Sequence, residues 1–133
     1  MFFKCSDKRI ELIGDRAVNL ILKADLLIDI PELYNIKCMI KKDIAWGTMH
    51  EIFFYWRWNP FFITLAKSDV NGTKMWINTK YMPTDEAELG GLIAHELAHN
   101  LGFVHQGNLP TEANKLTVPW VLGKWVRDNY RRV

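Results

Sequence analysis

Cysteine is scarce in this chain, which has only Cys5 and Cys38 among its 133 residues. Two cysteines are too few for a disulfide framework, and their spacing is not the C-x-x-C of a zinc ribbon or a redox pair, so we expect two free thiols. A surplus of one charge is absent as well, because 17 basic residues are balanced by 15 acidic ones. The resulting net charge of +2 predicts no nucleic-acid partner and no membrane partner.

Long apolar runs are also missing. The longest nearly apolar segment near the N-terminus, residues 20–30, contains three charged side chains, which excludes a membrane span of about 20 apolar residues. The first apolar residues are followed by Lys4 and by the charged residues 7–9, so no apolar core of an export signal begins the chain. We expect a cytoplasmic protein, and release by cell lysis is compatible with the same features.

Apolar and aromatic residues are abundant by contrast. Hydrophobic residues make up 49% of the chain, with six tryptophans and seven phenylalanines, while charged residues make up 24%. A chain of this length and composition can bury one core without the help of disulfides. We therefore expect one folded domain over residues 1–133.

Three segments have the periodicity of amphipathic helices. The first covers residues 6–30, where apolar residues recur at intervals of three and four. The second begins at Asp85, which forms a capping pair with Glu88, and ends at Gly102. The third begins after Thr117 and forms the C-terminal part of the chain.

Alternating apolar and polar residues predict strands over residues 33–41, 51–58 and 74–81, with a further candidate over residues 61–66. An Asn-Gly pair at residues 71–72 fits a tight turn. It predicts an antiparallel hairpin of the last two strands, with residues 61–66 at the edge of the sheet. Together with the helices, these strands predict an α+β fold with a small mixed sheet.

The segment HELAHNLGFVHQ, residues 95–106, holds three of the four histidines of the chain. On a helix, His95 and His99 lie one turn apart on the same face, so both imidazoles can bind one ion. Glu96 lies beside this pair, where a carboxylate can accept a proton from a metal-bound water without binding the metal itself. The pattern therefore predicts a metal site with an adjacent general base.

The third ligand is expected after a reversal of the chain. Gly102 can close the helix in the left-handed conformation, which would return His105 to the two other imidazoles. Three neutral nitrogen ligands with an open fourth position favour a catalytic Zn²⁺ site. Glu112 and Asp128 are alternatives for the third ligand, but the spacing favours His105. A shuffled sequence would contain this five-residue pattern roughly once in 10⁵ trials.

The residues of this pattern match H-E-x-x-H-x-x-G-x-x-H, and the chain resembles a very small metzincin-type zinc metallopeptidase; the matching positions are His95, Glu96, His99, Gly102 and His105. The resemblance implies a zincin domain with an N-terminal helix, a small twisted mixed sheet, a zinc-binding helix and a short C-terminal part ending in a helix. It also implies zinc on the three histidines, and Glu96 as general base and acid in the hydrolysis of a peptide or protein substrate.

The methionine turn of the metzincins is missing, because no methionine follows Met82. The segment TVPW, residues 117–120, is our candidate for the apolar floor under the metal, with Val118 or Trp120 against the histidines. The fourth histidine, His50, has no second histidine four residues later. We interpret it as a surface or strand-end residue.

Two further segments are candidates for substrate contacts. The resemblance suggests that an extended substrate lies along the edge strand, for which residues 61–66 are our candidate. A set of aromatic residues either lines a subsite or, as is more usual for such a pattern, belongs to the core; it comprises Phe53, Tyr55, Trp56, Trp58, Phe61 and Phe62.

Two other functions are compatible with the same residues. One is a zinc-binding module that recognises a peptide without turnover, and the other is an amidase that acts on the stem peptides of the cell wall. A pure binder needs the histidines but not Glu96, so the sequence favours a zinc metalloendopeptidase. The amidase would perform the same reaction on a different substrate.

Overall fold

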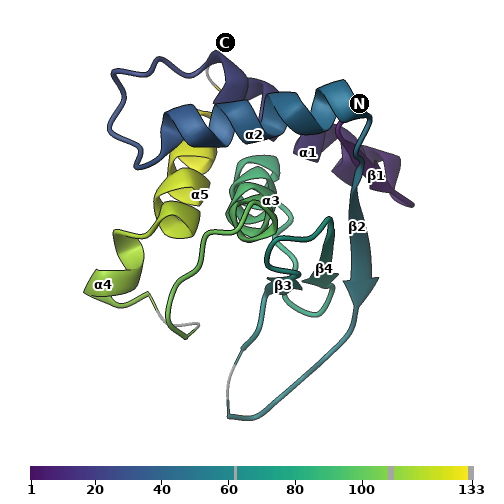
Figure 1. Ribbon diagram of the computed structural model, residues 1–133. Coiled ribbons are helices and arrows are strands. Elements are labelled where there is room, and N and C mark those ends of the chain that lie inside the picture. Colours follow the sequence, from purple (N-terminus) through teal and green to yellow (C-terminus); the bar gives the residue numbers. More distant parts are fainter. Residues whose placement is uncertain (62, 108–109, 132–133) are drawn as a thin grey trace.

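The computed structural model describes residues 1–61, 63–107 and 110–131. Over these residues the chain forms five helices and a four-stranded sheet, which is an α+β fold (Figure 1). The helices are α1 (Lys8–Lys23), α2 (Leu33–Trp46), α3 (Glu86–Asn100), α4 (Glu112–Lys115) and α5 (Val118–Asn129). The strands are β1 (Phe3–Cys5), β2 (His50–Tyr55), β3 (Ala66–Ser68) and β4 (Lys74–Asn78). None of these helices has the length and apolar character that crossing a membrane requires.

The sheet is small and mixed. Its strand order is β1-β2-β4-β3, with β1, β2 and β4 parallel and β3 antiparallel to β4. The predicted hairpin is therefore confirmed, and Asn71 in its turn has a left-handed φ of 59°, which asparagine tolerates. β3 is an edge strand, as expected, with β1 at the opposite edge, but it begins only at Ala66, the last residue of the predicted segment 61–66.

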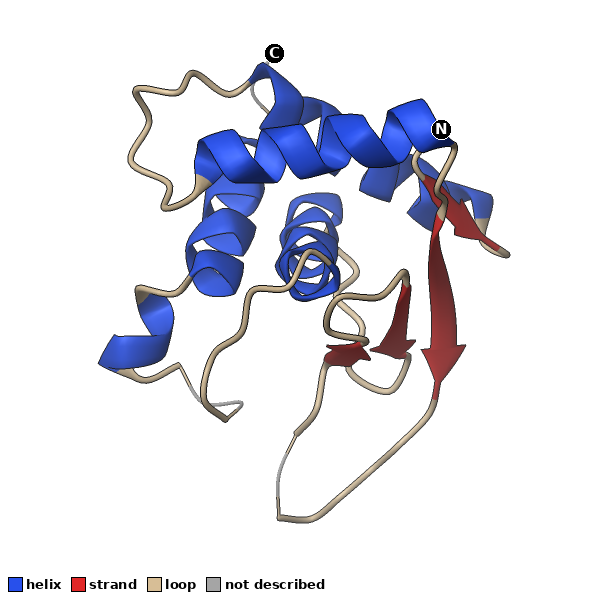
Figure 2. Cartoon of the chain, in the orientation of Figure 1, coloured by secondary structure: helices blue, strands red, loops and turns tan. Residues whose placement is uncertain are grey.

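Helix α3 lies at the centre of the molecule, where it packs against α1, α5 and the sheet (Figure 2). Its start is set by Asp85, whose carboxylate accepts a hydrogen bond from the backbone N–H of Glu88 at 3.1 Å. Its apolar face is fully buried, as the periodicity predicted, and includes Leu89, Ile93 and Leu97. This helix therefore both fills the core and carries two of the three predicted ligands, His95 and His99.

Helices α3 and α5 pack closely because each has a glycine at the contact. A Cβ atom on Gly91 would lie 2.7 Å from the carbonyl oxygen of Gly123, and a Cβ on Gly123 would lie 2.9 Å from that of Gly91. A Cβ on Gly123 would also lie 3.2 Å from the Cβ of His95. The predicted C-terminal helix is thus confirmed as α5, and it lies directly against the part of α3 that carries His95.

The strand predicted over residues 33–41 is wrong, because this segment forms helix α2. Ile36 and Ile40 are fully buried one helical turn apart, and Gly47 ends the helix in the left-handed conformation with a φ of 69°. A separation of four residues fits both a strand repeat and a helix repeat, so the short window did not distinguish between the two.

The predicted N-terminal helix is confirmed as α1, but it ends earlier than expected. The helix stops at Lys23, and Leu27, which was assigned to the apolar face, is 92% exposed. The side chain of Asp25 accepts a hydrogen bond from the N–H of Leu27 at 2.9 Å, a local turn that competes with the helix. Strand β1 and helix α4 were not predicted, because both are too short to show a periodicity. Cys5 and Cys38 are free thiols, as expected.

The two longer predicted strands are confirmed, but both end early. The segment 51–58 overlaps β2, which begins one residue earlier at His50 and ends at Tyr55, and the segment 74–81 contains β4, which ends at Asn78. The polypeptide leaves the sheet at both points, and the backbone N–H of Thr79 still donates to the carbonyl oxygen of Tyr55 at 2.8 Å. The strands thus end together at one side of the sheet.

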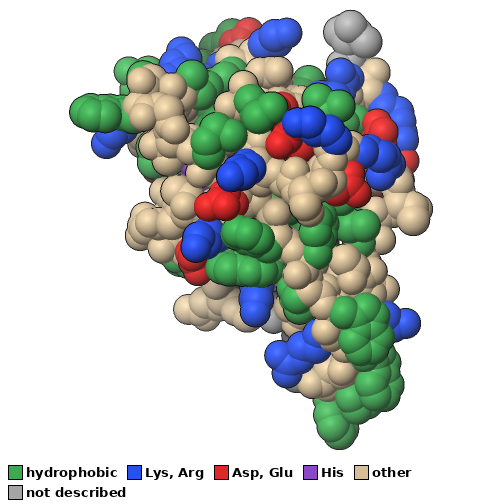
Figure 3. Space-filling view, turned by 90° about the vertical axis from the view of Figure 1, so that its right-hand side faces the viewer, with side chains coloured by type: hydrophobic (Ala, Val, Ile, Leu, Met, Phe, Trp, Pro, Cys, Tyr) green, Lys and Arg blue, Asp and Glu red, His purple; other side chains and the backbone are tan. Residues whose placement is uncertain are grey.

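Three aromatic residues just beyond β2 lie outside the core. Trp56, Trp58 and Phe61 are exposed, and Phe62 lies outside the described residues. Hydrophobic side chains gather at the lower end of the molecule in Figure 3, at the height where the loop between β2 and β3 lies in Figure 1. The strand alternation did not predict this, because it extended β2 through residues that project from the sheet.

Candidate metal centre

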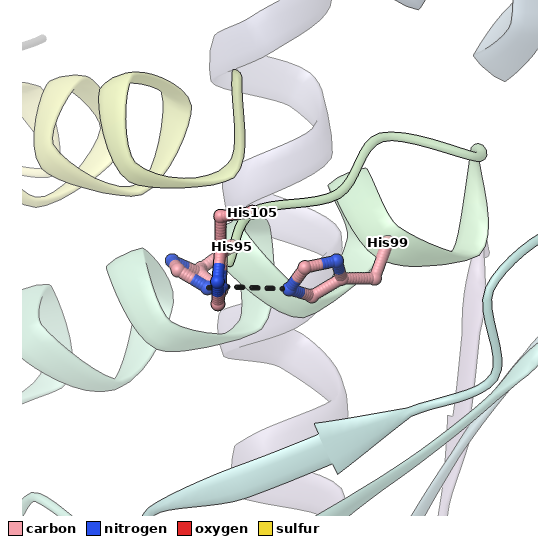
Figure 4. Close-up of side chains that lie close together, drawn as sticks. All are labelled: His95, His99 and His105. Atoms are coloured by element: carbon pink, nitrogen blue, oxygen red, sulfur yellow. Dashed lines mark hydrogen bonds between the residues drawn. The ribbon is translucent and has the colours of Figure 1, made fainter. Parts of the chain in front are cut away.

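Three of the four histidines converge on one point (Figure 4). His95 and His99 lie one turn apart on α3, with ring centroids 5.1 Å apart. After α3 the chain reverses at Gly102, whose φ is 105°, and returns His105 to the pair. Nε2 of His105 lies 2.9 Å from Nε2 of His95 and 3.2 Å from Nε2 of His99. The structure thus brings together the three histidines that the sequence predicted as ligands.

The separations between these nitrogens fit a single metal ion. Zinc–nitrogen bonds of about 2.0–2.1 Å at tetrahedral angles place neighbouring ligand nitrogens about 3.3–3.4 Å apart. The separations of 2.9 and 3.2 Å lie within about half an ångström of that value. Three imidazole nitrogens without a thiolate suit zinc and similar divalent ions. This group of histidines could therefore hold a metal ion.

A hydrogen bond sets the tautomer of His99. Its Nδ1 lies 2.7 Å from the backbone carbonyl oxygen of Phe103. Because a carbonyl oxygen only accepts, Nδ1 carries the proton and donates it, and Nε2 bears the lone pair that faces His105. A backbone carbonyl behind the imidazole is a usual partner of a metal-binding histidine.

Burial keeps the histidines of α3 neutral. Burial, together with the smaller effects of the nearby imidazoles of His99 and His105, lowers the pKa of His95 to about 3. Burial also lowers the pKa of His99, against the opposing effect of its hydrogen bond to Phe103. The neutral imidazole is the form that binds a metal ion, so these side chains are in the ligand form at neutral pH.

A buried carboxyl lies beside the histidines. Glu96 is only 4% exposed, and burial raises its pKa to about 7, although a hydrogen bond from Ser68 Oγ to its Oε2 at 3.2 Å opposes this shift. A carboxyl with such a pKa can both take up and release a proton near neutral pH. Ser68 was not predicted as a site residue, because it lies on β3, far from Glu96 in the sequence.

The site opens into a cleft of about 1240 Å³ that contains the three histidines and Glu96. One wall consists of the edge strand β3 and residues 63–65 before it, and the other wall is formed by α3 and α5. The volume is larger than that of a typical small-molecule pocket, which is about 300–1000 Å³. The cleft therefore has room for several residues of an extended chain.

Trp120, from the predicted segment 117–120, lies against the histidines. Its ring centroid is 5.0 Å from that of His95, with the rings at 89°, and 5.9 Å from that of His105. Val118, the other candidate for the floor of the site, is buried in the main core instead. Of the two candidates, Trp120 is thus the one beside the imidazoles.

The alternative third ligands lie elsewhere. Asp128 accepts a hydrogen bond from Lys124 at 2.6 Å, and Glu112 is the first residue of α4. Over residues 1–61, 63–107 and 110–131, the group of possible ligand atoms within 4.8 Å of one another contains the three histidines and neither of these carboxylates. The geometry therefore favours His105, as the spacing did.

His50 begins a strand, as expected, but it is not at the surface. It is 1% exposed, with Nε2 2.8 Å from Asp43 Oδ2 and Nδ1 3.1 Å from Asn100 Oδ1. Its ring stacks on that of Phe2 at a centroid distance of 4.6 Å. Because these partners come from α2, from α3 and from the residue just before β1, no local pattern could show that His50 is buried.

Comparisons with protein families, curated proteins and solved structures find no match to this chain. A fold by itself does not define an activity, so the function has to be argued from the residues of the site. These residues define a three-histidine centre that could hold a metal ion, with a buried carboxyl beside it in an open cleft.

Proposed function

We propose that the chain is a zinc-dependent metallopeptidase, a minimal protein of the metzincin type. The observation that carries the proposal is the convergence of three Nε2 atoms beside the buried carboxyl of Glu96 in an open cleft. This arrangement combines metal ligands, a proton-transfer group and access for a substrate. A site that only held a metal ion would not need a carboxyl with a pKa of about 7.

The three histidines would hold zinc through their Nε2 atoms. A zinc ion bound there supplies Lewis-acid chemistry, because it lowers the pKa of a water molecule and polarises a carbonyl group. The carbonyl of Phe103 fixes the ring of His99 through Nδ1, and Trp120 covers the imidazoles of His95 and His105. These contacts hold the ligands in place before a metal ion or a substrate arrives.

Glu96 is the proposed general base and acid of peptide hydrolysis. Its carboxyl is not one of the converging ligand atoms, so it remains available for proton transfer. With a pKa of about 7, it can accept a proton from the attacking water and return it to the leaving nitrogen. The hydrogen bond from Ser68 to Oε2 keeps the carboxylate oriented toward the cleft wall formed by β3.

The shape of the cleft supports an extended peptide as substrate. β3 is the edge strand of the sheet, and its residues line the cleft. The backbone groups of an edge strand can pair with a peptide that adds as a further strand. Ile63, Leu65 and Leu92 make parts of the walls apolar, which suits apolar side chains of such a peptide.

A peptide cleavage screen with matched variants tests the proposal. Purified wild type, Glu96→Gln and Glu86→Gln would be analysed for bound zinc and incubated with a proteome-derived peptide library. Glu86 is the control because it lies on the same helix with its side chain 50% exposed, outside the cleft. We expect one zinc ion per chain in all three proteins, cleavage by wild type and Glu86→Gln, and a rate lower by about 10³-fold in Glu96→Gln.

The other outcomes separate the alternatives. Zinc binding without cleavage by any of the three proteins would refute the peptidase and support a zinc-binding interaction module. Cleavage of cell-wall stem peptides, but not of library peptides, would assign the same chemistry to an amidase. Absence of zinc after purification and reconstitution would refute all three functions.

A further inference from the structure

A hydrophobic loop projects from the body of the protein between β2 and β3. This aromatic loop, the described residues 56–61 and 63–65, lies at the lower end of the molecule in Figure 1, and hydrophobic side chains gather at that end in Figure 3. Its apolar side chains have large exposed fractions: 67% for Trp56, 58% for Trp58, 91% for Phe61 and 60% for Ile63. A cluster of exposed apolar side chains marks an interaction surface on a globular protein.

A buried asparagine ties the two ends of the aromatic loop together. Asn78, at the end of β4, is 1% exposed. Its Nδ2 donates to the carbonyl oxygens of Arg57 and Thr64, both at 2.9 Å, and its Oδ1 accepts from the N–H of Arg57 at 3.1 Å. The exposed apolar side chains therefore belong to a loop that a satisfied, buried polar group holds in shape.

The segment that carries the aromatic loop has charge of one sign. The chain from Ile52 to Ser68 contains Arg57 and Lys67 but no aspartate or glutamate. Lys80 adjoins the same region, since its backbone N–H donates to Oδ1 of Asn78 at 3.1 Å. The net charge of the whole chain is only +2, but three basic residues gather at the base of this loop without an acidic residue in the loop itself.

We propose that the aromatic loop docks the protein on an anionic lipid surface. Cations lie near the base of the loop, two tryptophans follow β2, and Phe61 lies midway along the loop. A lipid surface presents its groups in the same order: phosphates first, then the interface that tryptophan favours, then hydrocarbon for phenylalanine. The local charge near the loop thus indicates a lipid partner, which the net charge of the whole chain did not predict.

Other occupants fit the aromatic loop less well. In a second copy of the chain, a loop-to-loop contact would bring two sets of cations together, and their repulsion opposes association. A protein partner would need a concave groove bordered by carboxylates, whereas a projecting loop can enter a deformable surface directly. Residues 63–65 also line the cleft, so docking would place the mouth of the cleft beside the lipid surface.

Vesicle flotation tests this inference without reference to peptidase activity. The purified protein would be mixed with vesicles of phosphatidylcholine alone or of phosphatidylcholine with phosphatidylglycerol. We expect binding to the anionic vesicles to be at least about tenfold stronger than to the neutral ones, because cations add to the apolar contribution. The double variant Trp58→Ser/Phe61→Ser should lose at least about tenfold in binding to the anionic vesicles.

Matched variants identify the loop as the docking element. Trp46→Ser/Leu116→Ser removes apolar side chains that are 79% and 76% exposed elsewhere on the protein, and it should bind like wild type. Lys67→Gln and Lys80→Gln should each weaken binding to anionic vesicles by about fivefold and leave binding to neutral vesicles unchanged.

Three results would overturn the inference. The first is a wild type that does not float with anionic vesicles, and the second is a control double variant that loses as much binding as Trp58→Ser/Phe61→Ser. The third is self-association in analytical ultracentrifugation that Trp58→Ser/Phe61→Ser abolishes, which would assign the loop to a second copy of the chain. Since Trp58 and Phe61 are exposed, their replacement should leave folding intact, and circular dichroism checks this.

Discussion

Helix α3 contributes to two sites that contain histidine, the network around His50 and the candidate metal centre. The two sites differ in the atoms that face the imidazole nitrogens. At His50, the ring nitrogens face the side-chain oxygens of Asn100 and Asp43. At the candidate metal centre, Nε2 of His105 faces two other imidazole nitrogens. Two neutral imidazoles can share one proton, but three converging nitrogens leave at least one lone pair unmatched. The type of the facing atom, rather than burial, separates a structural histidine from a metal ligand.

Two buried polar residues of α3 also differ: Asn100 belongs to a hydrogen-bond network of the fold, whereas Glu96 has a perturbed pKa. The amide of Asn100 donates from Nδ2 to the carbonyl oxygens of Asp69 and Lys74, at 2.9 and 3.0 Å, and so ties the helix to the β3–β4 hairpin. Glu96 accepts a hydrogen bond from Ser68, and burial still raises its pKa to about 7. A satisfied polar network stabilises the fold, whereas a carboxyl with a perturbed pKa is suited to chemistry at some cost in stability.

Substitutions that compare the candidate metal centre with the network around His50 should have their largest effect on metal binding. His105→Ala should raise the dissociation constant for zinc on the order of 10³-fold, because it removes one of three metal bonds. His50→Ala should leave that constant within about twofold of wild type. Competition with a chromogenic chelator measures both values. Weaker zinc binding in His50→Ala than in His105→Ala would reverse the assigned roles.

The next effect concerns the cost of burying Glu96. In the metal-free protein, the folded state binds the proton of Glu96 more tightly than the unfolded chain does between pH 4.5 and about 7, so stability falls as the pH rises through this range. Glu96→Gln cannot lose that proton. It should therefore be more stable than wild type by on the order of 3 kcal/mol at about pH 8, with little difference at about pH 4.

Urea unfolding of both proteins in the presence of a chelator measures this difference. Glu86→Gln, on the same helix but with an exposed side chain, is the control and should show no such dependence on pH. If Glu96→Gln were more stable than wild type by the same amount at both pH values, the raised pKa assigned to Glu96 would be wrong, because the gain in stability would not arise from ionisation.

Loss of the structural histidine should affect stability instead of metal binding. His50→Ala should lower the free energy of unfolding by about 2 to 4 kcal/mol, because it leaves the buried Oδ1 of Asn100 without its contact to Nδ1 of His50 and removes the ring stacked on Phe2. The variant should still bind one zinc ion per chain. A stability equal to that of wild type would show that this network contributes little to the fold.

The smallest expected effect is on the pH dependence of activity. The hydrogen bond from Ser68 stabilises the charged form of Glu96, so Ser68→Ala should raise the pKa of this carboxyl. The acidic limb of the profile of kcat/KM against pH should then move upward by less than about one pH unit. A downward movement would show that Ser68 acts on the site in another way.

The candidate metal centre could be predicted from the sequence because its parts depend on local geometry. Asp85 begins the helix, two histidines lie one turn apart, and Gly102 reverses the chain toward His105. Each of these features needs only a few neighbouring residues to form, so the sequence pattern carries it.

Contacts between distant segments could not be predicted in the same way. Ser68 reaches Glu96 because β3 packs against α3, and Asn78 joins Arg57 to Thr64 because β4 lies between β2 and β3 in the sheet. Helix α2 was missed for a related reason, since tertiary packing decides between helix and strand in a short apolar segment. The α+β class with a small mixed sheet was correct, but the network around His50 depended on helix α2.

Because of the glycine contact between α3 and α5, the width of the cleft depends on how closely these two helices pack. A methyl group added at Gly123 would act as a wedge between the two backbones and shift α5, together with Trp120, away from His95. Because α5 forms part of one cleft wall, the aperture would change while the three ligands stayed on their own segments. To widen the cleft for bulkier substrates, substitutions should therefore begin at the glycine contact and leave the three histidines unchanged.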